Sequence, residues 1–448
     1  MTTEPEPVPQ RAVIVLPSTG EFDSRTYRIS RTLHGRGHEV TVLARWKPGL
    51  PRREVHALGY TIVRVEATAL DGLPLARLTA PPAARLLGRS DDGGGSGATG
   101  QEPGGDTERG WAHPAARPTS RLGGYVRRAR IFLQVRSHRR RALEAAPPAD
   151  VYHGMAYMGI SVALALGRRH RARVVYDSRD IYMAAANLAR LGGPIKWLLT
   201  RMERGWAQAA DRVITVNEPY AVELARRFDV PMPAIVMNCS YRTFPPDPPE
   251  RRFHAALGLA PATRVVLYQG GFSRDRGIEQ LIEAIHLVPD AALVCMGYGE
   301  IEPMIRAAAA DPANAGRVYL LPAVPPTEVL DWVASADVVG ALFQPTTINH
   351  RLSTPNKFLE AMAAGVPTVV SDDPGMAPIA RETGCGIPVD PTDVDAIAAA
   401  IRVIVDAPPG ERAAWRARAL AAAHATYHWE RQVETLLEEY GRLTGKPW

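Results

Sequence analysis

Short apolar stretches alternate with helix-length segments along both halves of this chain, and this alternation limits the fold more than any other feature. The first half opens with the apolar run RAVIVLP (11–17), a helical pattern that ends near Gly37, and a second apolar run HEVTVLA (38–44). Strand, helix and strand in this order favour a βαβ unit with parallel strands. The stretches DVYHG, RARVVYDSRD and DRVITVN continue the pattern. The sequence therefore predicts an α/β fold.

The second half restarts the same alternation after a proline-rich stretch, YRTFPPDPPERR (241–252), which we interpret as a hinge. Apolar strands are expected in RVVLYQGGF, AALVCMGYGE, RVYLLPAV and DVVGALF. A chain of 448 residues is too long for one compact domain. We therefore predict two doubly wound domains with parallel sheets, and an amphipathic helix in the closing segment YHWERQVETLLEEYGRL.

Composition narrows the class of protein. The hydrophobic fraction of 46% fits a soluble globular protein. The N-terminus MTTEPEPVPQ lacks the apolar core of a signal peptide, and three widely spaced cysteines fit reduced thiols in the cytoplasm. A net charge of +6 is compatible with an anionic ligand or a membrane surface. The Gly-rich segment 88–117 is expected to be a flexible loop.

Glycines and arginines follow the predicted strands of the second half. Gly270 and Gly271 end one strand, with Arg274 and Arg276 ahead of the next helix, and Gly297–Gly299 ends another strand. Glycines allow close approach of the backbone to a ligand, and arginine forks match pyrophosphate oxygens. The pattern is neither GxGxxG nor a P-loop. Loops of this kind converge at the carboxyl edge of a parallel sheet, where ligands bind.

The segment STPNKFLEAMAAG predicts a helix over 356–364, with Ser353 or Thr354 as its N-cap and Pro355 at its first position. A helix that starts at a sheet's carboxyl edge offers free N–H groups to phosphate. Glu360, one turn further, is placed to accept hydrogen bonds from the vicinal hydroxyls of a ribose. Taken alone, the segment is equally compatible with a capped helix that carries an incidental glutamate.

In this order, YQGGFSRDRGIEQLIEAI, LVCMGYGE, LLPAVPPTEVLDWVASADV and STPNKFLEAMAAGVPTVVSDDPG resemble the donor domain of GT-B glycosyltransferases, above all the retaining family 4. The stretches DSRTYRISRTLHGRGHEVTVLA and HWERQVETLLEEY also resemble that family. The resemblance implies two Rossmann-like domains facing across a cleft: residues 1–242 bind the acceptor, 253–425 bind the donor, and the helix in 426–448 returns to the first domain.

The same resemblance implies a cytoplasmic enzyme that moves a sugar from a nucleotide-diphosphate sugar, UDP- or GDP-linked, to an acceptor hydroxyl. It implies retention at the anomeric carbon and no requirement for a cofactor or a bound metal. The acceptor would be a small molecule, a glycan or a glycolipid.

Individual positions carry the resemblance further. Arg276 lies where the family has a basic residue that meets the donor diphosphate, and Glu360 matches the second acid of the Glu-x7-Glu motif. The sequence departs from the family pattern at two positions: Leu352 stands where the family has the first acid of that motif, and Gly271 stands where it has a basic residue. Arg274 is the candidate substitute for that basic residue. The implied donor-binding residues are Gly270, Gly271, Arg274, Arg276, Gly297, Tyr298, Ala323, Val324, Ser353, Thr354, Pro355, Asn356, Lys357 and Glu360.

Candidates in the first half are less well matched. His153 is the one histidine left of the family's His-x-His pattern; we count it with Arg276 and Glu360 as a catalytic candidate, although a structural role at a strand end fits equally. The candidate acceptor-binding residues are Gly20, Asp23, Arg25 and Asp180. Asp23 is equally suited to cap a helix, and the Asp177–Asp180 stretch has arginine where the family has histidine.

Two charged features are candidates for further sites. Asp393-Val394-Asp395 has the letters of a DxD metal motif, but it opens a helix, where acids favour the dipole, so we predict a cap and no metal. The basic run 121–141 favours a solvated helix face, with peripheral contact to the inner face of the membrane as the alternative. No nucleic-acid-binding module accompanies the charge.

Two rival functions remain at this stage. A sugar-nucleotide epimerase of the same fold would need additional acids and histidines around the sugar, and the sequence offers few. A donor-binding but inactive partner subunit would explain Leu352 and the altered histidine pattern. Glycosyl transfer is the leading prediction.

Overall fold

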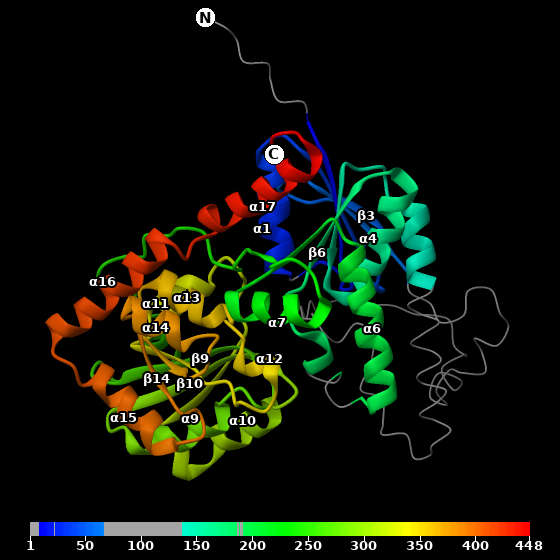
Figure 1. Cartoon of the computed structure of the whole chain (residues 1–448). Coiled ribbons are helices and arrows are strands. Elements are labelled where there is room, and N and C mark those ends of the chain that lie inside the picture. Colours follow the sequence, from blue (N-terminus) through cyan, green and yellow to red (C-terminus); the bar gives the residue numbers. More distant parts are fainter. Residues whose placement is uncertain (1–8, 22, 67–136, 186–187, 189–190) are drawn as a thin grey trace, which may run out of the picture. The chain divides into compact units, whose positions relative to one another are not determined.

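The computed structural model describes residues 9–21, 23–66, 137–185, 188 and 191–448 (Figure 1). The Gly-rich segment 88–117 and residues 121–136 of the basic run lie outside this part of the chain. The chain divides into two compact units, unit 1 up to Val175 and unit 2 from Tyr176 onward. The predicted domain limits 1–242, 253–425 and 426–448 stay a prediction.

Unit 1 is built around strands in the order β3-β4-β2-β1-β5-β6. β1 pairs in parallel with β2 and with β5, β2 pairs in parallel with β4, and the short β3 runs antiparallel to β4. The elements are β1 (Arg11–Val15), α1 (Ser24–Gly35), β2 (Glu39–Arg45), β3 (Arg53–Val55), β4 (Thr61–Val65), β5 (Val151–Met155), α4 (Ala156–His170) and β6 (Arg173–Asp177). Residues 137–145 are also helical.

Unit 2 begins with the end of β6 and continues the strand order as β6-β7-β8. β7 and β8 pair in parallel. This part contains the 3-10 turn Tyr182–Ala184, α6 (Gly193–Ala209), β7 (Arg212–Thr215), α7 (Glu218–Phe228) and β8 (Ala234–Ile235).

The rest of unit 2 holds a six-stranded sheet in the order β11-β10-β9-β12-β13-β14, in which every neighbouring pair is parallel. Its strands are β9 (Arg264–Phe272), β10 (Ala291–Gly299), β11 (Val318–Pro322), β12 (Val338–Ala341), β13 (Thr368–Ser371) and β14 (Gly386–Val389). Its helices are α8 (Arg252–Leu257), α9 (Ile278–Ala284), α10 (Glu302–Ala310), α11 (Val329–Ala334), α12 (Ile348–Arg351), α13 (Asn356–Ala364), α14 (Ala377–Thr383), α15 (Val394–Val405) and α16 (Pro409–Ala425).

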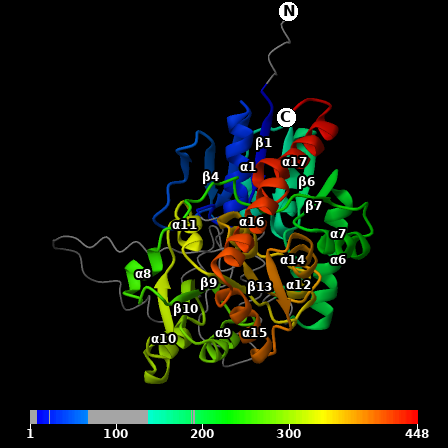
Figure 2. The same ribbon diagram turned by 90° about the vertical axis from the view of Figure 1, so that its left-hand side faces the viewer.

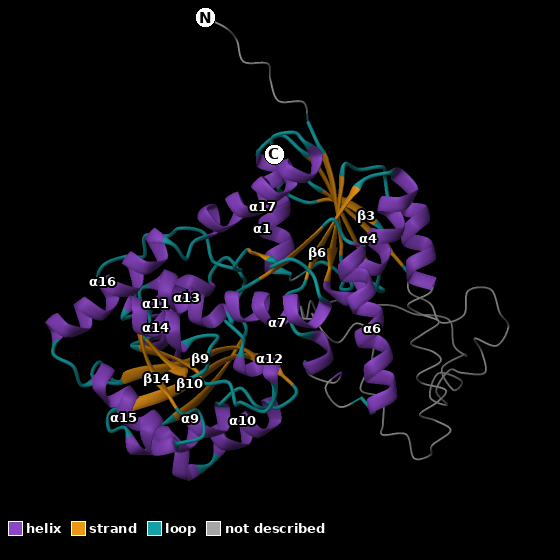
Figure 3. Ribbon diagram, viewed as in Figure 1, coloured by secondary structure: helices purple, strands orange, loops and turns teal. Residues whose placement is uncertain are grey.

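Alternating side chains of β9 supply two hydrophobic cores, one on each face of this sheet. Val266 and Tyr268 belong to a cluster with residues of α9 and α15, whereas Val265 and Leu267 pack with residues of α11 and α13. Successive strand residues point to opposite faces, so a strand that is buried on both faces has a continuous apolar sequence. Figure 3 shows the strands with helices on both faces, and α14 and α15 lie beside β13 in Figure 2. The predicted α/β fold with parallel sheets is confirmed.

The last helix, α17 (Trp429–Thr444), is held on β7 and β8. Gln432 Oε1 accepts from the Met237 amide at 3.1 Å, and Arg212 pairs with Glu439 at 3.1 Å. The Trp429 side chain is fully buried, and its amide donates to the Ser240 carbonyl at 2.8 Å. The amphipathic closing helix expected from the sequence is therefore present, and its apolar side is buried. Among the described residues, no helix is both long enough and apolar enough to cross a bilayer.

Replacement of Trp429 by alanine tests how much this attachment contributes to stability. We expect Trp429→Ala to lower the free energy of unfolding by about 3–5 kcal/mol, because it empties a fully buried site. The matched control is Trp197→Ala, since Trp197 is 65% exposed. Urea unfolding followed by circular dichroism measures both, and equal losses in the two variants would contradict the assignment.

Candidate functional site

The strand order of the six-stranded sheet reverses between β9 and β12. From β9 the chain moves outward to β10 and β11, and it then returns to place β12 on the other side of β9. The loops that follow β9 and β12 therefore leave the same edge in opposite directions, which is where open α/β sheets bind ligands. Gly270 and Gly271 lie near the end of β9, and Arg276 follows in the loop before α9. Residues 353–357 lie between α12 and α13 and in the first turn of α13, which come after β12.

Glycines shape the end of β9 in two different ways. Gly270 has φ +113°, a conformation that side chains disfavour, and both Gly270 and Gly271 are exposed, so that a Cβ added at either would have no neighbour within 4 Å. Gly297 instead meets the backbone, because a Cβ there would lie 2.0 Å from the Gly270 carbonyl oxygen. The glycine at 297 is thus required for strand packing, whereas 270 and 271 leave backbone open for a ligand.

Glu360 lies beside the end of β9 and is anchored there. Its Oε2 accepts a hydrogen bond from Gln269 Nε2 at 2.5 Å, and Gln269 directly precedes Gly270. A carboxylate has about four lone-pair positions, so one bond to Gln269 leaves capacity for the hydroxyls of a ligand. The side chain is half-buried, as a group that faces both the fold and a bound molecule would be.

Lys357 lies one turn before Glu360 and is buried, with 7% of its surface exposed. Its Nζ lies 3.2 Å from the centroid of the Tyr268 ring and has no hydrogen-bond partner among the described residues. Burial and the positive charge of Arg276 lower the pKa of Lys357 well below its ordinary value. A buried amine without a partner is costly, so this position favours an anion that would accept its hydrogen bonds.

Arg276 is held by an aromatic ring. Its guanidinium lies 4.2 Å from the centroid of the Phe343 ring, and its Nε donates to Ser273 Oγ at 3.3 Å. The pKa of His350 is lowered mainly by burial of its imidazole, and the charge of Arg276 lowers it further. Stacking fixes the plane of the guanidinium while leaving its outer N–H groups for an anion. Arg274, the second predicted arginine, is exposed.

Asn349, in α12, connects the loop after β12 to residues 180–220. Its Oδ1 accepts from the Ile181 amide at 2.7 Å and from the Tyr220 hydroxyl at 2.9 Å, and its Nδ2 donates to Asp180 Oδ1 at 3.1 Å. Burial raises the pKa of Asp180, and the Asn349 amide and the charges of Arg179 and Arg276 oppose that rise. Asp180, predicted as an acceptor-binding residue, is therefore brought close to Arg276.

Asn217 makes a second connection to the same loop. Its side chain caps α7 by accepting from the Tyr220 amide at 2.8 Å, and its Nδ2 donates to the Leu352 carbonyl at 2.7 Å and to Thr354 Oγ1 at 2.8 Å. Thr354 in turn donates to the Gly375 carbonyl at 2.6 Å. Leu352, which stands where the resembled family has an acid, thus contributes its backbone carbonyl to this connection.

These bonds overturn one detail of the sequence prediction. Neither Ser353 nor Thr354 caps α13; the N-cap position is Pro355, which offers no side-chain hydrogen bond, and the helix begins at Asn356. The physical reason is that the Thr354 hydroxyl is already committed to Asn217 and to Gly375. The first N–H groups of α13 are left without a side-chain cap, which keeps the helix N-terminus suited to an anion.

The remaining donor-binding candidates lie near the ends of neighbouring strands. Ala323 and Val324 follow β11 and are half-buried, Tyr298 lies in the last residues of β10, and Asn356 is exposed and accepts from Asn238 Nδ2 at 3.0 Å. Their contact with a nucleotide stays a prediction.

The candidates of unit 1 have structural roles of their own. His153 is fully buried within β5, in register with Ile14 of β1. Asp23 caps α1 by accepting from the Thr26 amide at 2.9 Å, and Arg25 is fully buried in the same helix. Gly20 has φ +80° in the loop before α1. The catalytic role of His153 and the acceptor-binding roles of the other three stay predictions.

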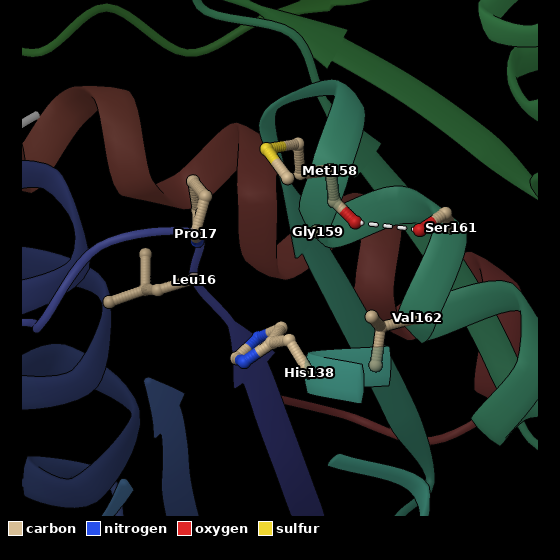
Figure 4. A pocket seen from close by; sticks show the side chains of 7 residues that line it. All are labelled: Leu16, Pro17, His138, Met158, Gly159, Ser161 and Val162. Atoms are coloured by element: carbon tan, nitrogen blue, oxygen red, sulfur yellow. Dashed lines mark hydrogen bonds between the residues drawn. The ribbon is translucent and has the colours of Figure 1, made fainter. Parts of the chain in front are cut away.

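A small cavity lies beside the end of β1 in unit 1 and is lined by Leu16, Pro17, His138, Met158, Gly159, Ser161 and Val162 (Figure 4). Its volume of about 10 Å³ is on the scale of one water molecule. Burial, with a smaller contribution from Arg45, lowers the pKa of His138 to about 4. The cavity is too small to hold a substrate.

Neither a metal centre nor a disulfide is found in the described part of the chain. No group of three or more His, Cys, Asp or Glu side chains there suits a metal ion. Asp393 caps α15 by accepting from the Ala396 amide at 3.0 Å, as the helix-cap interpretation predicted. Cys239, Cys295 and Cys385 are free and buried.

Comparison with known families covers both halves of the chain. Residues 263–407 match the family described as "Glycosyl transferases group 1", and residues 22–240 match the "Glycosyl transferase 4-like domain". The chain belongs to the family 4-like glycosyl transferases of the GT-B fold. The first match extends from β9 to the end of α15 and thus contains Gly270, Arg276, Lys357 and Glu360.

A relative of this chain agrees with that assignment. It is 27% identical over 310 residues to a D-inositol 3-phosphate glycosyltransferase of Mycobacterium marinum, a match that covers 66% of this chain and 64% of the relative. The chain thus spans somewhat less than two thirds of that relative's length.

Solved structures resemble the fold over almost the whole chain. The sucrose-phosphate synthase of Thermosynechococcus elongatus has a TM-score of 0.68 at 18% identity and covers 97% of this chain and 99% of its own. Anabaena HepE in complex with UDP-glucose has a TM-score of 0.64 at 15% identity and covers 97% and 100%. At this identity the likeness establishes the fold: the two Rossmann-like domains of GT-B glycosyltransferases.

Sequence reasoning missed four polar residues of the site: Gln269, Asn217, Tyr220 and Asn349. Asn217 carried a usable signal, since it follows an apolar strand and precedes Glu-Pro, a typical helix start. The sequence around Asn349 carries no comparable pattern. Its role depends on the loop after β12 meeting residues 180–220, which only the tertiary structure reveals.

Substitutions of Asn349 test the connection between these segments. Asn349→Ala leaves the buried Ile181 amide without its acceptor, so we expect a loss of about 1–3 kcal/mol in the free energy of unfolding. Asn349→Asp places a second carboxyl beside Asp180, and like charges raise the pKa of such a pair. The folded state then holds a proton more tightly than the unfolded state, so the stability of Asn349→Asp falls as pH rises above the ordinary carboxyl range of about 4.

The alanine variant is the matched control, because it adds no carboxyl. Urea midpoints measured across a pH series give the difference between the two variants. A constant difference from pH 5 to pH 8 would refute the contact with Asp180.

Proposed function

We propose that this chain is a glycosyltransferase that takes its sugar from a nucleotide-diphosphate sugar bound at the edge of the six-stranded sheet. The observation that carries the proposal is the convergence of Gly270–Gly271, Arg276, Lys357 and Glu360 where the strand order reverses. The phosphates of one ligand would meet the open backbone, the stacked guanidinium and the buried amine. The ribose of the same ligand would meet the fixed carboxylate.

Each group has a defined task in this proposal. Glu360 accepts from the ribose hydroxyls, with Gln269 holding its second oxygen. Arg276 and the N-terminus of α13 meet the diphosphate, on which negative charge builds as the anomeric C–O bond breaks. Lys357 donates to the same anion from its place at the Tyr268 ring.

Transfer proceeds with retention at the anomeric carbon. The bond from the anomeric carbon to the diphosphate oxygen breaks, and a bond to the acceptor oxygen forms on the same face. The proton of the acceptor hydroxyl passes to the departing phosphate, so no enzyme nucleophile, cofactor or metal ion is needed. Preorganised cations therefore supply the main stabilisation of the transition state.

The relatives indicate the class of donor and acceptor. The structure of Anabaena HepE is titled as a complex with UDP-glucose, and the Mycobacterium marinum relative is named for D-inositol 3-phosphate. A UDP-linked sugar and a polar hydroxyl acceptor fit these names, and GDP stays the second candidate nucleotide from the sequence. The three buried, free thiols fit a cytoplasmic location.

Titration calorimetry with UDP, GDP, dTDP and ADP tests the donor site. We expect one diphosphate to bind tightly and Glu360→Ala to weaken that binding about 10- to 100-fold, because the ribose loses its hydrogen-bond acceptor. Glu411→Ala, at an exposed position of α16, is the control. Unchanged affinity in Glu360→Ala would remove Glu360 from the site, and binding without transfer of any sugar would favour the inactive partner subunit.

Arg276→Ala distinguishes contact with the diphosphate from contact with the nucleoside. We expect the affinity for the nucleoside diphosphate to fall about 10- to 100-fold and that for the bare nucleoside to change little, since charge-assisted bonds contribute about 1.5–3 kcal/mol each. Arg276→Lys keeps the charge without the planar fork and should lie between wild type and alanine. Equal losses for diphosphate and nucleoside would contradict the assignment.

A further inference from the structure

The helix α6, labelled in Figure 1, carries several large apolar side chains that are exposed. Trp197 is 65% exposed, Leu198 50% and Met202 40%, and Ile195 at the start of the helix is also exposed. Single exposed hydrophobic residues are normal on a protein surface, but a contiguous group marks an interaction site. Four such residues within eight positions of one helix form a group of this kind.

The opposite side of α6 is fixed to the fold. Glu203 is buried and accepts from the Tyr176 hydroxyl at 2.7 Å, and burial raises the pKa of this carboxyl to about 7. Gln208 Nε2 donates to the Phe228 carbonyl at the end of α7 at 2.9 Å, and Ala207 is buried. The outward direction of Trp197 and Leu198 is therefore set by the docking of the helix.

Helical spacing places the exposed residues on one stripe. Trp197, Leu198, Arg201 and Met202 follow the i, i+1, i+4, i+5 pattern that shares one helix face. The Arg201 guanidinium lies 5.9 Å from the centroid of the Trp197 ring. Helices that lie in a membrane interface combine large apolar side chains with basic ones, and this stripe has both.

The charge on α6 has one sign. Its basic residues are Lys196, Arg201 and Arg204, and its one carboxylate, Glu203, faces the fold. Arg204 is paired with Asp229 of the neighbouring α7 end at 2.8 Å. Lys196 shares the side of the helix that carries the buried Glu203 and Ala207, so Arg201 is the cation within the apolar stripe. A second copy of this chain would bring the same positive charge to a symmetric contact, whereas anionic lipid headgroups complement it.

We propose that this face of α6, formed by Ile195, Trp197, Leu198, Arg201 and Met202, docks on the surface of an anionic lipid bilayer. The apolar side chains enter the boundary between headgroups and acyl chains, and Arg201 stays at the headgroups. None of these residues belongs to the basic run 121–141. The proposal does not depend on the proposed function, because docking requires neither nucleotide nor sugar.

Vesicle flotation of the full chain tests the proposal. The probes are vesicles of phosphatidylcholine alone and of phosphatidylcholine mixed with phosphatidylglycerol. We expect the wild-type chain to float with the anionic vesicles and the variant Trp197→Ser/Leu198→Ser/Met202→Ser to bind them at least about tenfold more weakly. Unchanged binding of the triple variant, or no binding of the wild type to anionic vesicles, would overturn the proposal.

The matched control changes exposed hydrophobic residues elsewhere in unit 2. Met232→Ser/Phe244→Ser/Val403→Ser alters side chains that are 54%, 79% and 55% exposed, and it should bind vesicles as the wild type does. Equal weakening in this control would show that docking is not specific to α6. Circular dichroism and nucleotide binding of both triple variants confirm that each is folded.

A charge variant separates the lipid surface from other partners. Arg201→Glu keeps the apolar side chains and should weaken binding to anionic vesicles while leaving the weak binding to neutral vesicles unchanged. Sedimentation of the wild type without vesicles tests the remaining occupant. A dimer that the α6 triple variant converts to monomer, with no vesicle binding, would assign the face to a second copy and refute the proposal.

Discussion

The close approach of β9 and β10 is the constraint on which the candidate site depends. Gly297 has no room for a Cβ, since one would lie 2.0 Å from the Gly270 carbonyl, and Gly299 is confined in the same way by Phe272. The two strands therefore pair up to their last residues, and β9 delivers Gln269 and Gly270 to the sheet edge in a fixed position. Glu360 is then held by a residue of β9 itself.

Polar side chains outside the sheet hold the second half of the site. The loop after β12 carries Asn349 and Thr354, and each is bonded to residues from the 180–220 part of the chain. Loops normally vary more than the elements that they connect. Here the side-chain amides of Asn349 and Asn217 bond backbone groups from distant segments, so residues 180–220 are linked by hydrogen bonds to the loop that precedes α13.

The fold could be predicted from the sequence because it depends on local patterns. Continuous apolar runs such as those of β9 and β10, separated by helix-length segments, are typical of buried parallel strands. Gly270, Arg276 and Glu360 could be placed at one edge for the same reason. The bonds of Asn349, and those of Asn217 beyond its cap of α7, could not be predicted, because their partners are more than a hundred residues away. The cap of α13 was misassigned because Thr354 bonds Gly375.

The two cations of the site have different environments, and this difference sets what each can contribute. Arg276 stacks on Phe343 and keeps its charge, because a guanidinium does not lose its proton in proteins. Lys357 is buried near Arg276, and both burial and that charge lower the pKa of its amine. An anion beside Tyr268 would oppose both effects, since it supplies hydrogen-bond acceptors and adds to the negative charge of Glu360, which already raises the pKa of the amine. Binding of an anion at the proposed site would therefore raise the pKa of Lys357 and offset its repulsion from Arg276.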